Sequence, residues 1–425
     1  MNPRTLIASL AAKRHDTFWR NNAIFFVGSI GVSFLNYLYY PVLGRLLSLE
    51  SFGELQVLIS FFTQITIFIG VLTMISTNIV LNEKNTDVTN RTVNELEKFT
   101  LHIGYGLLVL VTLASPLLRD TLKFESALPF ILIMLVFVAG ISLGFKTAYL
   151  RGKNDYMATT IEGALASITK LLASAGLVAL GLQTAGAAGG ILVAQLIALA
   201  YATYKAKQHG YKRSITATKP DWSVLRPQAR YAGLVLFVSL IVTLQYSADV
   251  TIVKYLFSPE VAGQYAGIAT ISRIVLFLTG SFAVVLLSSV TLSRPPAENS
   301  RLLIKSFIIT ALLGGSAALV FAAFPTFVVH VLFGTKYDTL AHLLPLLSFA
   351  MFAMSLNNLL ATYHIALRHY GVMLYVGLGA LATVVAIVIS HGDPAAIVRG
   401  LAIGSAVMLA GLLGWTGYRA GYSLR

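Results

Sequence analysis

Long apolar runs are the feature that most constrains the fold of this chain. Twelve of them are about 20 residues long, the length that an α-helix needs to cross the hydrocarbon core of a bilayer. Only 11% of the residues are charged, against about 25% in soluble domains, and the mean hydropathy is +0.77. We therefore predict an all-α polytopic membrane protein with about twelve transmembrane helices. The runs are 22–43, 54–80, 99–118, 127–149, 158–181, 186–204, 231–253, 262–290, 303–324, 342–366, 371–390 and 395–417.

The longest interruption divides these runs into two sets of six. Residues 205–230 hold seven Lys and Arg residues and one acid, Asp221. We interpret this segment as a basic cytoplasmic linker. It would follow a cytoplasmic N-terminal segment (1–21) and an N-terminal six-helix bundle (22–204), and precede a C-terminal six-helix bundle (231–425).

The basic residues also predict an orientation. If the N-terminus is cytoplasmic, 23 of the 31 Lys and Arg residues fall in cytoplasmic segments and six in outer segments, as the positive-inside rule requires. We expect a multi-pass protein of the bacterial cytoplasmic (inner) membrane with both termini in the cytoplasm. The same rule accounts for the net charge of +14, so no nucleic-acid partner is implied.

Two motifs occur once in each half of the chain. Each six-helix set has an even number of helices, so both sets start from the same side of the membrane. This predicts parallel repeats related by an axis along the membrane normal, with the first helices of the two halves facing each other. The motifs are S-x-E-x-x-G (Ser48, Glu50 and Gly53; Ser258, Glu260 and Gly263) and the strings 163–167 (GALAS) and 379–383 (GALAT).

Several function classes are disfavoured by what the sequence lacks. It contains no cysteine, which excludes disulfides and Cys-ligated metals. It has no Walker A motif, no H-E-x-x-H and no clustered His, Asp and Glu at metal spacing. The outer segments are too short for the extended loops of a membrane glycosyltransferase. We expect a protein that is not an enzyme and needs no metal or other cofactor.

Charged residues within apolar runs are functional candidates, because a charge costs a few kcal/mol at bilayer depth. Arg273 lies about eleven residues into its run, or about 16 Å of helix rise, near the midplane. We predict that it binds substrate; the alternative is a buried pair with Asp249. Lys170 lies near the middle of 158–181, with Glu162 on the same helical stripe. It either binds substrate, pairs with another helix or extends to the interface.

Two carboxyl groups and four neutral side chains complete the candidate set. Asp249 and Glu162 are predicted coupling or gate residues, although Asp249 could instead cap its helix or pair with Lys254. The neutral candidates for binding sugar are Asn36, Tyr40, Gln56 and Gln245. Polar residues at helical spacing also stabilise contacts between helices, and tyrosines near a boundary also form interfacial belts. The residues alone leave these alternatives open.

Residues 39–54 (YYPVLGRLLSLESFGE), Asp249, 263–265 (GQY) and 272–273 (SR) carry a resemblance to a known family. The chain resembles the polysaccharide flippases of the multidrug, oligosaccharidyl-lipid and polysaccharide exporter superfamily. The resemblance implies two bundles around a central cavity, lined mainly by helices one, two, seven and eight, and alternating access. In a relative that moves the peptidoglycan precursor, an arginine on the eighth helix is thought to meet the diphosphate, and Arg273 occupies the matching helix. Such lipid-precursor flippases usually have fourteen helices, whereas twelve are predicted here.

We therefore expect a flippase that moves a polyprenyl-diphosphate-linked oligosaccharide across the membrane for assembly of a surface polysaccharide such as lipopolysaccharide. Basic midplane residues favour an anionic substrate. Membrane lipids and polysaccharide polymerase machinery are further expected partners. The alternatives are a cation-coupled exporter of small molecules or drugs, and a non-transporting membrane component of a polysaccharide assembly complex.

Overall fold

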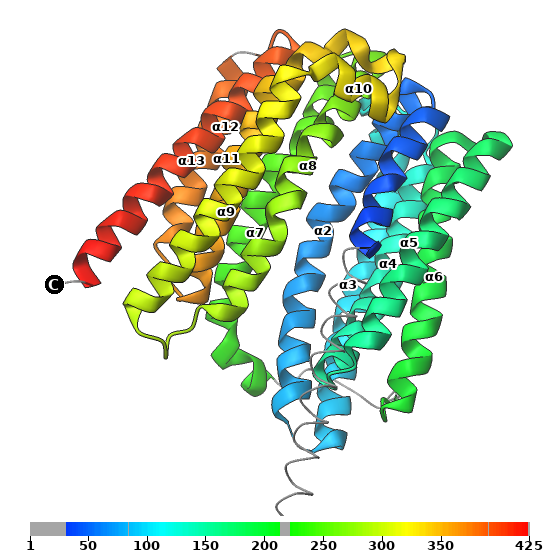
Figure 1. Cartoon of the computed structure of the whole chain (residues 1–425). Coiled ribbons are helices and arrows are strands. Elements are labelled where there is room, and N and C mark those ends of the chain that lie inside the picture. Colours follow the sequence, from blue (N-terminus) through cyan, green and yellow to red (C-terminus); the bar gives the residue numbers. More distant parts are fainter. Residues whose placement is uncertain (1–30, 84, 213–221, 390, 424–425) are drawn as a thin grey trace, which may run out of the picture. The chain divides into compact units, whose positions relative to one another are not determined.

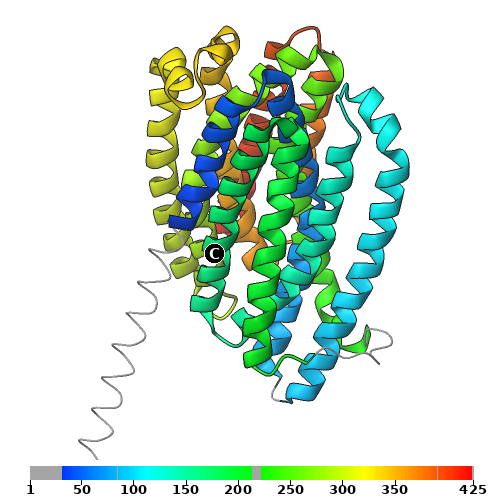
Figure 2. The same cartoon turned by 90° about the vertical axis from the view of Figure 1, so that its right-hand side faces the viewer.

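The computed structural model describes residues 31–83, 85–212, 222–389 and 391–423. The predicted N-terminal segment 1–21, the start of the first predicted helix and the middle of the predicted linker lie outside the described residues. Every regular element within the described residues is helical (Figures 1 and 2). In a bilayer this is expected, because a helix satisfies its own backbone hydrogen bonds.

Each of the twelve predicted apolar runs contains a helix, which confirms the predicted fold class. The helices commonly extend a turn or more beyond the apolar run at one or both ends, and α3 and α7 start about three turns earlier. The first described helix covers 31–46. It is followed by α2 (Leu49–Asn82), α3 (Thr86–Thr121), α4 (Leu128–Gly152), α5 (Tyr156–Leu177), α6 (Gln183–Gln208), α7 (Trp222–Leu256), α8 (Pro259–Ser289), α9 (Pro296–Ala323), α11 (Leu344–Ala366), α12 (Val372–Ile389) and α13 (Pro394–Ser423).

Ten helical segments of the described residues are long and apolar enough to cross a membrane, and one of them, 156–208, holds two predicted helices. The break between these two lies at η1 (Val178–Leu182), where Gly181 has φ 88°. This left-handed backbone favours glycine. After the break α6 returns along α5, as Figures 1 and 2 show. The Ser174 hydroxyl donates to the Ala187 carbonyl across this hairpin (3.0 Å).

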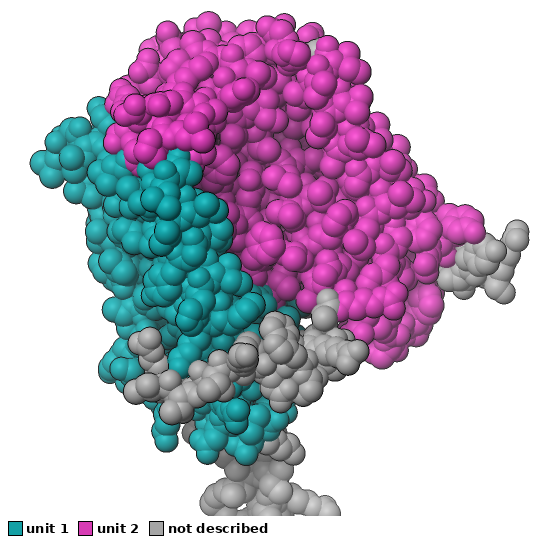
Figure 3. Space-filling view, turned by 180° about the vertical axis from the view of Figure 1, so that it is seen from behind, with its two compact units in different colours: residues 1–46, 72–115, 128–221 teal, residues 47–71, 116–127, 222–425 magenta. Residues whose placement is uncertain are grey.

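Contacts divide the chain into two compact units, coloured in Figure 3. Unit 1 comprises 1–46, 72–115 and 128–221, and unit 2 comprises 47–71, 116–127 and 222–425. Helices α2 and α3 therefore each contribute to both units. The helices α6 and α7 extend into the predicted linker 205–230, because α6 ends at Gln208 and α7 begins at Trp222.

Two short helices, α10 (Pro325–Phe333) and η2 (Thr335–Leu343), were not predicted from the sequence. They lie in unit 2 and pack on the start of α2. The Phe52 ring meets the rings of Phe333 and Tyr337 edge to face, at centroid distances of 5.4 and 5.9 Å. The Lys336 ammonium donates to the Leu47 carbonyl (2.5 Å), so this segment fixes the turn that carries the first copy of the repeated motif.

The repeated S-x-E-x-x-G motif has the same local role in both copies. The Ser48 hydroxyl accepts from the Ser51 amide (3.1 Å), and the Ser258 hydroxyl accepts from the Val261 amide (3.4 Å). Each serine thus caps the first turn of α2 or α8, where unpaired amide groups need an acceptor. The acid two residues later, Glu260 in the second copy, lies in the first helical turn, where the helix dipole favours negative charge.

The glycines of the two copies meet each other in unit 2. A Cβ on Gly53 would lie 3.0 Å from the backbone nitrogen and Cα of Gly263. A Cβ on Gly263 would overlap the backbone carbonyl of Leu49. The motif therefore ends in glycine because α2 and α8 cross here backbone to backbone. This contact joins the second helices of the two halves, so the expectation that the first helices face each other stays a prediction.

We predict that Gly263→Ala lowers the melting temperature of the protein in detergent by several degrees. The added methyl group must push the backbones of α2 and α8 apart, and overpacking of this kind costs about 1–3 kcal/mol. The matched control is Gly280→Ala on the same helix, where a Cβ meets nothing within 4 Å. It should leave the melting temperature unchanged or raise it, because alanine favours a helix. Equal effects of the two substitutions would contradict the role of the crossing.

Candidate functional site

In unit 1 the Lys170 side chain is held by neutral groups. Its ammonium donates to the Asn36 side-chain oxygen (2.6 Å) and lies 4.7 Å from the centroid of the Tyr39 ring. Lys170 forms no ion pair with a carboxylate among the described residues. A positive charge on Lys170 is therefore not neutralised by a carboxylate of the described residues, and the first described helix supplies both of its neutral partners.

The Asn36 amide also joins two helices. Its nitrogen donates to the Ser167 hydroxyl (2.8 Å), which in turn donates to the Gly163 carbonyl (2.8 Å). Gly163 is the first and Ser167 the last residue of the repeated string 163–167. Asn36, a predicted sugar-binding residue, is thus the centre of a hydrogen-bond chain from Lys170 to the backbone of α5.

The second half makes the same bond in unit 2. The Gln245 amide nitrogen donates to the Thr383 hydroxyl (3.1 Å), and this hydroxyl donates to the Gly379 carbonyl (3.1 Å). Gln245 and Thr383 thus correspond to Asn36 and Ser167. The position that matches Lys170, three residues after the hydroxyl, is Ala386. The Gln245 side-chain oxygen is buried, and no hydrogen-bond partner for it is found among the described residues.

In unit 2 the Arg273 side chain is paired. Its guanidinium donates to the Asp249 carboxylate (2.6 Å) and to the Tyr246 carbonyl (2.9 Å). The other Asp249 oxygen accepts from the Tyr265 hydroxyl (3.0 Å). Arg273 is 8% exposed and Asp249 1%. The pairing that the sequence left as an alternative for Arg273 is therefore present, and Asp249 is bound by Arg273 and Tyr265 rather than by Lys254.

The remaining predicted residues are Gln56, Tyr40 and Glu162. Gln56 is buried on α2, and its amide nitrogen has no hydrogen-bond partner within the described residues. Tyr40 packs edge to face on Tyr39, with centroids 5.6 Å apart. The buried Glu162 carboxylate accepts from the Thr147 hydroxyl (2.9 Å). These placements leave their roles in binding and coupling as predictions.

Sequence reasoning missed one buried charge pair. The Lys146 ammonium lies 2.5 Å from the Glu97 carboxylate, and both side chains are 8% exposed. The Tyr211 hydroxyl donates to the same carboxylate (2.7 Å). Glu97 precedes the predicted run 99–118, and Lys146 lies near the predicted cytoplasmic end of 127–149, so neither is a candidate near the midplane. Their spacing, 49 residues apart on different helices, gave no signal of pairing.

Sequence reasoning also gave no partner for the polar residues at the middle of α2. The Gln64 amide donates to the Ser60 and Ser247 hydroxyls (3.1 Å each), and the Ser60 hydroxyl donates to the Ser247 carbonyl (2.6 Å). These bonds join α2 to α7 within unit 2. They show that these polar side chains of α2 stabilise a helix–helix contact, as such residues commonly do.

The fold is similar to that of solved multi-pass membrane transporters. It is similar to a solved structure of the lipid II flippase MurJ in an inward closed conformation, with a TM-score of 0.75 and 13% identity over 93% of this chain and 87% of that chain. It is also similar to an inward-facing multidrug resistance MATE family transporter of the MOP superfamily, with a TM-score of 0.71 and 12% identity over 91% and 95% of the two chains. At these identities the likeness concerns the fold alone.

The sequence assigns the chain to a protein family. Residues 18–287 match the model of the family described as "Polysaccharide biosynthesis protein", and the chain belongs to that family. This confirms the resemblance inferred from residues 39–54 and from the motif residues of α7 and α8. No curated protein matches the sequence significantly.

We predict that Arg273→Ala strongly destabilises the protein, because it leaves the buried Asp249 carboxylate without its cation. Breaking a buried pair in this way costs about 3–5 kcal/mol. Arg399→Ala is the matched control, since Arg399 and Asp393 form an exposed pair, and such pairs are worth about 0–1 kcal/mol. The measurement is thermal unfolding in detergent.

The double variant Arg273→Ala/Asp249→Asn should recover part of the lost stability, because it removes the unpaired charge. If Arg273→Ala is as stable as Arg399→Ala, the pair does not hold α7 to α8. The double variant then also gives a folded background in which the role of Arg273 in transport can be measured.

Proposed function

We propose that this protein is a flippase for a polyprenyl-diphosphate-linked oligosaccharide. The observation that carries the proposal is the environment of Lys170. Its ammonium is bound by an amide oxygen and an aromatic ring, so its charge remains available to an anion. A cation in a poorly solvated site interacts strongly with phosphate. Membership of a polysaccharide biosynthesis family supports a substrate that carries a glycan.

In this proposal the diphosphate binds Lys170 first. Arg273 contributes where its pair with Asp249 opens, since in the paired state its guanidinium is occupied by Asp249 and Tyr246. The amide and phenol groups of Asn36, Gln56, Gln245 and Tyr40 bind sugar hydroxyls. The polyprenyl chain stays among membrane lipids while the headgroup site becomes accessible first from one membrane face and then from the other.

The driving force would be the membrane potential. Each elementary charge that crosses 100 mV contributes about 2.3 kcal/mol, and an anionic headgroup that leaves a negative interior gains this energy. Asp249 and Glu162 are the carboxyl groups that could carry a coupled proton instead. The proposal places the protein in the bacterial inner membrane with cytoplasmic termini, and divides it into bundles 22–204 and 231–425 on either side of the linker.

We predict that Lys170→Gln abolishes surface polysaccharide and causes one polyprenyl-linked oligosaccharide to accumulate several-fold. Glutamine removes the charge but can still donate to Asn36, so the helix contact is conserved. The measurement is mass spectrometry of the polyprenyl-linked glycan pool from cells that express each variant, and the accumulated mass identifies the sugar.

The matched control is Lys305→Gln, the same substitution at an exposed lysine on α9. It should leave the glycan pool unchanged at equal protein abundance in the membrane. Normal polysaccharide output from Lys170→Gln would exclude the assigned role of Lys170. An unchanged pool in cells that lack the whole gene, together with altered drug sensitivity, would instead indicate a small-molecule exporter.

A further inference from the structure

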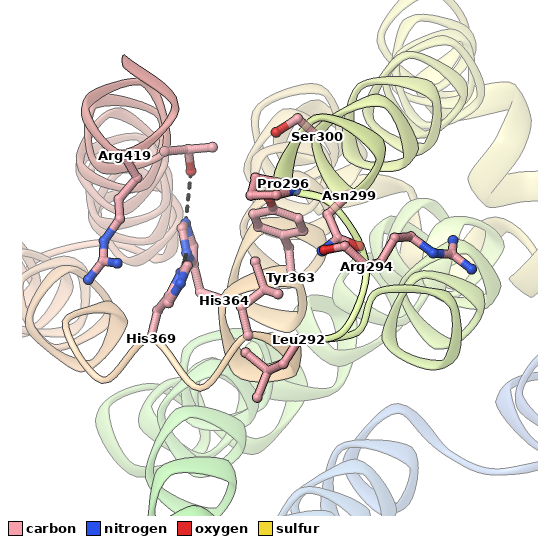
Figure 4. Close-up of a pocket in the computed structure, with 11 residues that line it drawn as sticks. Leu292, Arg294, Pro296, Asn299, Ser300, Tyr363, His364, His369 and Arg419 are labelled. Carbon is pink, nitrogen blue, oxygen red and sulfur yellow. Dashed lines mark hydrogen bonds between the residues drawn. The ribbon is translucent and has the colours of Figure 1, made fainter. Parts of the chain in front are cut away.

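A cavity of about 380 Å³ lies in unit 2 at the end opposite the α7–α8 turn. It is formed by the α8–α9 connection, the start of α9, the end of α11 and the end of α13 (Figure 4). Two arginines and two histidines line it: Arg294, Arg419, His364 and His369. Figure 4 shows Arg419 and His369 on one side of the cavity and Arg294 on the other.

The histidines of this cavity are ordered by a hydrogen-bond chain. The Thr416 hydroxyl donates to the Leu412 carbonyl (2.6 Å), so it accepts from His364 Nε2 (2.9 Å). A neutral His364 then has a bare Nδ1, and His369 Nδ1, 3.1 Å away, donates to it. In neutral His369 this leaves Nε2 without a proton. A second proton on Nε2 adds both a positive charge and a donor to the cavity.

An apolar groove of about 290 Å³ continues from the cavity. Thr416 lines both, so the two hollows meet at this residue. The groove is lined by residues of α9, α11 and α13, among them Gly417, where a Cβ would meet nothing within 4 Å. Its other lining residues are Leu303, Ile304, Phe307, Ile308, Leu360 and Leu413.

Charge at this end of unit 2 is strongly one-sided. Arg301 and Lys305 are exposed on α9 near the cavity-lining Arg294. Arg368 lies over the Tyr231 ring (5.1 Å) and Arg230 over the Tyr370 ring (4.5 Å). The opposing acid among the described residues here is Glu298, 3.9 Å from Arg294. Basic pockets next to apolar helix surfaces are suited to the phosphate headgroups of anionic lipids.

We propose that this cavity and groove form a binding site for an anionic phospholipid, distinct from the site at Lys170. The lipid phosphate binds Arg419 and protonated His369, with Arg294 across the cavity, and one acyl chain lies in the groove between α9, α11 and α13. The cavity with basic side chains fits the headgroup, and the adjoining apolar groove fits the acyl chain. The proposal does not depend on the identity of the transported molecule.

The test uses Trp415 as a reporter, because its ring lies 6.3 Å from the ring of the cavity-lining His364. A Trp19→Phe/Trp222→Phe background leaves Trp415 as the single tryptophan. The protein in neutral detergent is titrated with phosphatidylglycerol or phosphatidylcholine brominated on the acyl chain. Quenching is measured relative to the unbrominated lipid. We expect phosphatidylglycerol to quench at a lower mole fraction than phosphatidylcholine, by roughly fivefold.

Variants separate a built site from general surface charge. Arg419→Gln and His369→Gln should each remove most of the preference for phosphatidylglycerol, whereas Arg301→Gln removes one exposed charge outside the cavity and should retain it. Gly417→Leu fills the groove and should weaken quenching by both lipids. The proposal is overturned if the two lipids quench alike or not at all, or if Arg301→Gln reduces the preference as much as Arg419→Gln.

The preference should also depend on pH. The pKa of His369 is lowered by burial and, second, by Arg419. His364 is hydrogen-bonded to His369, and Arg294, which is paired with Glu298, lies across the cavity. A bound phosphate raises this pKa, so the added affinity is present at low pH and is lost as the pH rises through the His369 pKa of the complex. Quenching by phosphatidylglycerol should therefore strengthen between about pH 7.5 and about pH 5.5, and His369→Gln should abolish this change. A change that persists in His369→Gln would overturn the assignment of His369.

Discussion

Unit 2 depends on a crossing at which no side chain separates two helices. At Gly53 and Gly263 the backbones of α2 and α8 are in contact, and each helix is capped by a serine one turn or so earlier. The unpredicted segment α10–η2 then packs on this crossing through Phe333 and Tyr337. A short motif thus specifies both the start of a helix and the distance to its counterpart in the other half.

Three cations within the predicted spans, Arg273, Lys146 and Lys170, differ in the charge of their partners. Arg273 and Lys146 are each paired with a carboxylate, and that carboxylate also accepts a hydrogen bond from a tyrosine hydroxyl. Such closed arrangements cancel their charge and join helices, and they suit a structural role. Lys170 is different, since its partners are neutral. The distinction between cancelled and uncancelled charge is what makes Lys170 a better probe of transport than Arg273.

Much of the fold could be predicted from the sequence, because membrane spans are determined by the length of apolar runs. The helix ends could not: α3 begins at Thr86 with polar residues such as Asn94, which are buried by contacts with residues near the end of the chain's first half. The two short helices α10 and η2 were missed because their apolar residues adjoin longer runs. Of the candidate site, the pair Arg273–Asp249 could be anticipated, since both charges lie in adjacent spans. The bond from Asn36 to Ser167 could not, because it joins residues 131 apart and any of several hydroxyls fitted the pattern.

The bond of Asn36 with Ser167 and the bond of Gln245 with Thr383 are the same kind of contact, but only the first lies beside a lysine. The second half holds its helices with the same amide-to-hydroxyl bond while carrying alanine at the position of the lysine. The bond between Gln245 and Thr383 thus forms although no charged side chain stands at that position. The helix contact does not need the lysine. The two halves therefore differ at this place in the charge of one side chain and not in the bond that joins the helices.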